Sequence, residues 1–142
     1  MKSALFISLI LFFLGCDGKI NKNIYDKSKI GATASSIEIV ANDKESLSFS
    51  KKIMQERGFV VGKSDYSLRV EHRDYAKACT NPLSKTSSDY SYDGLVVVEL
   101  FYKDGKIYSI YRDFKGKVSE KHFATLIDIM IDDLEIRLKN IK

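Results

Sequence analysis

Few side chains in this 142-residue sequence could carry out chemistry, since it contains only two cysteines and two histidines. Cys79 and His72 have the side chains of a thiol–imidazole pair, in which the imidazole takes the thiol proton, but no pattern places them together. His122 has no partner at the spacing of a zinc site, and Asp128 and Asp132 fit a solvated helix face better than a cation site. The sequence also lacks a phosphate-binding glycine loop, a nucleophile elbow and a dinucleotide fingerprint. We therefore expect no catalytic residue, no metal ligand and no enzyme activity.

The first sixteen residues, MKSALFISLILFFLGC, have the layout of an export signal. Lys2 supplies the positive start, residues 4–14 are apolar except for Ser8, and the small Gly15 precedes Cys16. An apolar helix of this length spans about 16 Å, roughly half of a ~30 Å hydrocarbon core. The run is therefore too short for a stable membrane span, and residues 1–15 are expected to be a signal peptide.

Phe13-Leu14-Gly15-Cys16 resembles the lipobox of bacterial lipoproteins, with Phe13 at a position where leucine is usual. The resemblance implies cleavage before Cys16, a diacylglycerol on the Cys16 thiol and an acyl chain on the new amine. Two or three acyl chains, at ~0.8 kcal/mol per buried methylene, hold a protein on a bilayer almost permanently. Asp17 resembles the retention signal for the inner membrane in enteric bacteria, but that rule is not general, so inner and outer membrane both remain open. No cofactor is expected besides these covalent chains.

The remaining chain divides into a tether and one domain. Residues 16–35 are rich in Lys, Asn, Asp, Ser and Gly and show no sustained apolar period, which predicts a lipidated tether that is flexible or loosely packed. Residues 36–142 are enough for a single domain. Basic and acidic residues are nearly balanced once the signal is removed, which does not favour nucleic acid as a partner.

Hydrophobic periodicity predicts an α+β domain with the order β-α-β-β-β-α. Asn42, with Glu45 three residues later, is expected to start the first helix, and Ser119 to cap the second. Asp104-Gly105 predicts a hairpin turn that pairs Phe101 with Tyr108. The expected architecture is a four-stranded sheet with two helices on one face, built from strands at 36–41, 66–73, 94–102 and 106–114 and helices at 43–57 and 119–140.

The predicted hairpin is apolar on both faces, although two helices can cover only one. The other face is expected to be covered by a loop, a partner or a ligand, or to remain as an unusually apolar exposed patch. The tyrosine-bearing loop 74–93 is the nearest candidate for a cover. Tyrosine offers a large contact area with a polar tip, which suits recognition. The candidate binding residues are Tyr75, Tyr90 and Tyr92 in the loop and Phe101, Tyr108 and Phe114 on the sheet.

The lipobox and the order of elements together resemble the small lipoprotein subunit of the lipopolysaccharide-assembly translocon and similar envelope-assembly lipoproteins. This resemblance implies a membrane-anchored protein of the bacterial cell envelope whose domain faces the periplasm. Its expected role is a non-catalytic interaction or assembly module for another envelope protein. The alternative is a binder of a small amphiphile, a lipid or glycan fragment, between the sheet and residues 74–93.

Overall fold

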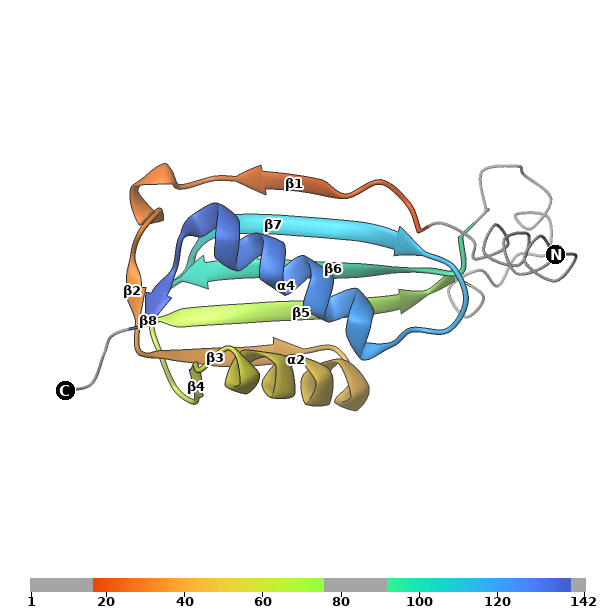
Figure 1. The fold of residues 1–142 in the computed structure, drawn as a ribbon, viewed down its shortest axis with the longest axis horizontal. Helices are drawn as coiled ribbons and strands as arrows, with labels where there is room; N and C mark the ends of the chain where they lie inside the picture. The colour runs from red at the N-terminus through yellow and green to blue at the C-terminus, as the bar shows by residue number, and fades with distance from the viewer. Residues whose placement is uncertain (1–16, 76–91, 139–142) are drawn as a thin grey trace, which may run out of the picture.

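The computed structural model describes residues 17–75 and 92–138, which fold as an α+β domain (Figure 1). Two helices pack on a mixed six-stranded sheet of order β1-β7-β6-β5-β3-β4. The sheet and the two helices are formed, in chain order, by β1 (Asn21–Ile24), β3 (Ser36–Ala41), α2 (Lys44–Glu56), β4 (Val60–Val61), β5 (Tyr66–Asp74), β6 (Gly94–Tyr102), β7 (Gly105–Phe114) and α4 (Glu120–Leu134). The 3-10 turn η2 (Lys27–Lys29) and a second, two-stranded sheet of β2 (Thr33–Ala34) and β8 (Arg137–Leu138) complete the described chain.

The α+β class is confirmed, but the predicted four-stranded sheet and the predicted order β-α-β-β-β-α are wrong. The four expected strands are present as β3, β5, β6 and β7, and β1 and β4 extend the sheet at its two edges. β1 arises within residues 16–35, where the sequence predicted a flexible or loosely packed tether, and it pairs antiparallel with β7 from Asn21–Tyr111 to Ile24–Tyr108. Its sequence, Asn-Lys-Asn-Ile, has no apolar alternation, so backbone hydrogen bonds to the edge of β7 define this strand.

Both helices cover the same face of the sheet. α2 packs on β3 and β5, α4 packs on β6 and β7, and the helices contact each other through Phe49 and Phe123, whose ring centroids are 5.8 Å apart. Figure 1 shows α4 lying across the strands. Burying each large apolar side chain contributes about 1.5–3 kcal/mol, so this layer contact is the main source of stability. The fully buried side chains include Ile37, Ile53, Met54, Leu68, Leu100, Ile110, Phe123, Leu126, Ile127 and Met130.

The start of α2 differs by one residue from the prediction. Asp43, and not Asn42, caps the helix, because its carboxylate accepts a hydrogen bond from the Ser46 N–H at 2.8 Å. The Asn42 side chain instead donates to the His72 carbonyl and accepts from the His72 N–H, at 2.8 and 3.0 Å. It thereby continues the pairing of β3 with β5 beyond the end of β3.

The second helix is shorter than predicted. α4 begins after Ser119 as expected but ends at Leu134, because Glu135 takes a left-handed conformation with φ of 48°. The Leu134 carbonyl then accepts a hydrogen bond from the Gly31 N–H at 2.8 Å. The chain continues as β8, parallel to β2, in place of the predicted last helical turn.

The register of the hairpin differs from the predicted one by a single residue. The observed partners are Leu100 with Tyr108, Val98 with Ile110 and Gly94 with Phe114, and the ladder is irregular between Leu100 and Phe101. Because side chains alternate across a strand, a one-residue shift moves each β7 side chain to the opposite face. The bulge near the turn therefore decides which aromatic residues enter the core.

The buried hydroxyl of Ser50 provides a first test of the core. Ser50 is fully buried, and its Oγ has no hydrogen-bond partner within the described residues. Ser50→Ala is therefore expected to raise the unfolding free energy by about 1 kcal/mol, measured by urea denaturation, because it removes an unpaired polar group. The matched control is Ser46→Ala in the same helix, which should destabilise because the Ser46 Oγ donates to Asp43 at 2.6 Å. A loss of stability in Ser50→Ala would contradict this packing.

Candidate functional site

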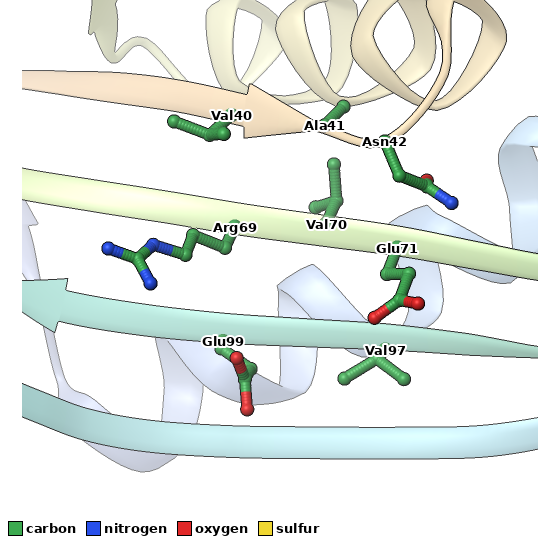
Figure 2. A pocket seen from close by; sticks show the side chains of 8 residues that line it. All are labelled: Val40, Ala41, Asn42, Arg69, Val70, Glu71, Val97 and Glu99. Atoms are coloured by element: carbon green, nitrogen blue, oxygen red, sulfur yellow. The ribbon is translucent and has the colours of Figure 1, made fainter.

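The face of the sheet opposite the helices is not covered by any described element. In Figure 2 the side chains of Val40, Arg69, Val97 and Glu99 stand on the near side of their strands, with the helices behind. They come from three adjacent strands, β3, β5 and β6. Together they form a depression of about 250 Å³, lined by Val40, Ala41, Asn42, Arg69, Val70, Glu71, Val97 and Glu99.

This open face combines apolar side chains with charged side chains that are already paired. Glu99 accepts a hydrogen bond from Lys106 Nζ at 2.6 Å, and this bond raises the pKa of the lysine. The Arg69 guanidinium lies over the Phe101 ring, 4.0 Å from its centroid. Val40 remains 48 % exposed beside these pairs. A mixed surface of this kind is compatible with a contact to another protein, since such interfaces are on the whole about as apolar as the rest of a protein surface.

Two of the aromatic residues predicted for this face lie in the core. Tyr108 is fully buried on the helix side, where its hydroxyl donates to Asp133 of α4 at 2.6 Å. Phe114 is also buried there, with its ring centroid 4.8 Å from that of His122. The expectation that they share the open face is wrong, because the predicted hairpin register differs by one residue from the observed one. Phe101 does lie on the open face, but it is only 7 % exposed.

Of the three loop tyrosines predicted for binding, the structure describes Tyr75 and Tyr92, and both lie at one end of the sheet. The Tyr75 hydroxyl donates to the Asp113 carboxylate of β7. Tyr92 lies beside Gly18, and Lys115 Nζ is 5.7 Å from the centroid of its ring. Tyr90, together with Cys16 and Cys79, lies outside the described residues. Tyr92 therefore contacts the beginning of the described chain and Tyr75 contacts β7, and neither lines the depression.

A second cluster, which the sequence did not predict, surrounds Asp17 at that same end. The Asp17 carboxylate accepts a hydrogen bond from the Lys115 N–H at 3.2 Å. It also lies 3.7 Å from Arg112 Nη1 and 3.7 Å from His122 Nε2. These residues are distant in sequence and carry no common motif, so only the antiparallel return of β7 and the start of α4 bring them together.

The backbone of Gly18 is held by the same strand. Its N–H donates to the Asp113 carbonyl at 2.8 Å, and its carbonyl accepts from Arg112 Nε at 2.8 Å. Gly18 is buried, and a Cβ at this position would be 3.1 Å from the Asp113 Cβ. The Asp17-Gly18 segment is therefore packed into the domain from the first residue that the structure describes.

His122 is a neutral acceptor in this cluster. Its Nδ1 accepts a hydrogen bond from the Ser119 N–H at 3.0 Å, which is the return bond of a capping box. Burial lowers the pKa of His122; Asp17 acts in the opposite direction, and the positive charge of Arg112 adds to the lowering. The imidazole therefore helps the fold in its uncharged form.

This histidine predicts a pH dependence of stability. Because the pKa of His122 is lowered in the folded protein, the unfolded chain binds this proton more tightly. The contribution of neutral His122 to the unfolding free energy is therefore complete above about pH 6.5 and is lost as the pH falls below that value. We expect the urea midpoint to fall between pH 7.5 and pH 5. His122→Gln keeps an acceptor for the Ser119 N–H but does not titrate, and it should flatten this part of the profile. An unchanged slope in His122→Gln would assign the effect to another group.

The described residues offer little for other chemistry. Within the described residues, 17–75 and 92–138, no group of three or more His, Cys, Asp or Glu side chains is placed to hold a metal ion. Both Asp128 oxygens accept hydrogen bonds from Arg57, each at 2.9 Å, so this carboxylate holds α2 to α4. None of the helices in the described part of the chain is long and apolar enough to cross a membrane. Comparison of the chain with protein-family models, with curated proteins and with solved structures finds no match.

Proposed function

We propose that this protein is a bacterial lipoprotein anchored through Cys16. Residues 1–15 act as the signal peptide, Cys16 carries a diacylglycerol and an N-acyl chain, and the domain faces the periplasm from the inner or the outer membrane. The support is the order of charge, apolar run, small residue and cysteine at the start of the sequence. The acyl chains supply the attachment to the bilayer.

The domain then acts as a non-catalytic interaction module for another envelope protein. The observation that carries this proposal is the open sheet face, on which exposed Val40 and partly buried Val97 lie among charged side chains. A small amphiphile is the weaker alternative, because sites that enclose such ligands are deeper clefts of about 300–1,000 Å³ with mostly apolar walls. The depression is flanked by Arg69, Glu71 and Glu99, and neither Tyr75 nor Tyr92 lines it.

The anchor is tested by expressing the full chain and measuring the mass of its N-terminal peptide after membrane fractionation. We expect a mature chain that begins at Cys16, carries two or three acyl chains and sediments with one of the two membranes. Cys16→Ser should lose the acyl mass and the membrane association. An intact chain with an unmodified Cys16 thiol in the soluble fraction would reject the lipoprotein proposal.

The interaction face is tested by chemical crosslinking in cells, followed by capture of the protein. Val40→Lys places a charge on the open face, whereas Val60→Lys makes the same change at a residue that is 57 % exposed and pairs with Ser36 at the other end of β3. We expect Val40→Lys to reduce recovery of a specific crosslinked envelope protein by about tenfold, the equivalent of 1.4 kcal/mol. An equal effect of both variants, or no enriched protein with the wild type, would contradict the assignment.

A further inference from the structure

The contacts of Asp17 and Gly18 determine how far the domain can lie from its anchor. Asp17 follows Cys16 directly in the chain, so the two Cα atoms are about 3.8 Å apart. Asp17 is held by Arg112 and by the Lys115 N–H, and Gly18 is bonded to β7 through both its N–H and its carbonyl. No flexible residue therefore separates the expected site of lipidation from the folded domain.

These contacts also determine which end of the domain is nearest the anchor. In Figure 1 this end contains the end of β7, the turn that follows it and the start of α4, while the β6–β7 turn lies at the opposite end. Lys103 belongs to that distant turn, where its N–H donates to the Asp65 carbonyl. The long axis of the sheet thus runs from the anchor end to the Lys103 end.

The anchor end exposes three lysines that have no carboxylate partner among the described residues. Lys115, Lys117 and Lys121 lie in or next to the turn between β7 and α4, and all three are exposed. Two nearby carboxylates keep their charge and accept hydrogen bonds from neutral donors within the fold: Asp93 from the Gly116 N–H at 2.6 Å, and Asp113 from the Tyr75 hydroxyl. The three exposed ammonium groups can meet anionic groups outside the protein.

We infer that the end of the domain formed by Asp17, Gly18 and residues 112–121 docks on the surface of an anionic bilayer and gives the domain one fixed orientation. This inference rests on the proposed acylation of Cys16, which delivers this end to the membrane. Each lysine near a negatively charged surface strengthens the contact by about fivefold, so the three lysines favour the orientation that brings them to the bilayer. The open sheet face then stands beside the bilayer, approximately along its normal, and not against it.

The test is amine labelling of the acylated mature protein, read by mass spectrometry at each lysine. The protein is compared in detergent and in vesicles of phosphatidylethanolamine and phosphatidylglycerol. We expect Lys115, Lys117 and Lys121 to lose at least about threefold in labelling rate in vesicles, while Lys63 and Lys103 at the other end stay within about 1.5-fold, as the estimated lysine contribution implies. Equal protection at both ends would overturn the inference.

A linker variant separates orientation from mere attachment. Ten Gly/Ser residues inserted between Cys16 and Asp17 add a reach of about 16–19 Å and should abolish most of the difference between the two ends. Protection that is unchanged by the linker would show that direct attachment does not orient the domain. If the cellular protein carries no acyl chain, the lipoprotein proposal fails, but the orientation can still be tested. For that test, residues 16–142 with Cys79→Ser are coupled at Cys16 to a maleimide lipid and labelled in the same way.

Discussion

Gly94→Ala is expected to destabilise the domain by about 2–3 kcal/mol, the cost of forcing atoms into a fully packed site. A Cβ on Gly94 would lie 2.5 Å from the Arg73 carbonyl oxygen and 2.5 Å from the Phe114 ring. The carbonyl belongs to the neighbouring strand β5, so it cannot move without breaking the pairing of Asp74 with Gly94. Urea unfolding followed by circular dichroism measures the loss.

The control for this prediction is Gly62→Ala, where a Cβ would have no neighbour within 4 Å. That change should alter the unfolding free energy by less than about 0.5 kcal/mol. Phe114→Leu in the Gly94→Ala background should recover only part of the loss, because the clash with Arg73 remains. A Gly94→Ala protein as stable as Gly62→Ala would mean that neither the Arg73 carbonyl nor the Phe114 ring packs against this glycine.

Much of the fold was predictable, because its central elements follow simple periodicities. The four longest strands alternate in polarity or form continuous apolar runs, and the two helices repeat their apolar residues at three and four positions. β1, β4 and the β2–β8 pair were not predicted, since each is short and depends on a partner strand that is distant in sequence. The end of α4 was missed because Glu135 adopts a left-handed conformation without the usual glycine.

The candidate sites were harder to predict than the fold. That two helices leave one sheet face open followed from the element count, but the residues on that face depended on the hairpin register. A bulge near the turn shifted this register by one residue and placed Tyr108 and Phe114 in the core. The cluster of Asp17 with Arg112 and His122 has no sequence signal, because a loose polar segment and a packed edge strand have similar compositions.

Tyr108→Phe is expected to lower the unfolding free energy by about 1.5–2 kcal/mol, as for a partly buried hydrogen bond to a charged group. The Tyr108 hydroxyl donates to Asp133 at 2.6 Å, and Lys22 Nζ donates to the same carboxylate at 2.7 and 2.8 Å. One carboxylate therefore links β7, α4 and β1. The control is Tyr111→Phe on the opposite, open face of the sheet, where Tyr111 is 41 % exposed. It should change the unfolding free energy by less than about 0.5 kcal/mol.

The pH dependence of the unfolding free energy of Tyr108→Phe tests the same hydrogen bond independently. Burial alone would raise the pKa of Asp133, but hydrogen bonds from Lys22 and Tyr108 outweigh it and lower the pKa. The stabilisation by this carboxylate is thus present above about pH 4 and is lost as the pH falls through the lowered value. The difference between wild type and Tyr108→Phe should be largest near neutral pH and shrink in acid. Equal unfolding curves for the two proteins at neutral pH would mean that the Tyr108 hydroxyl does not bond to Asp133. They would also contradict the hairpin register that makes Tyr108 a core residue.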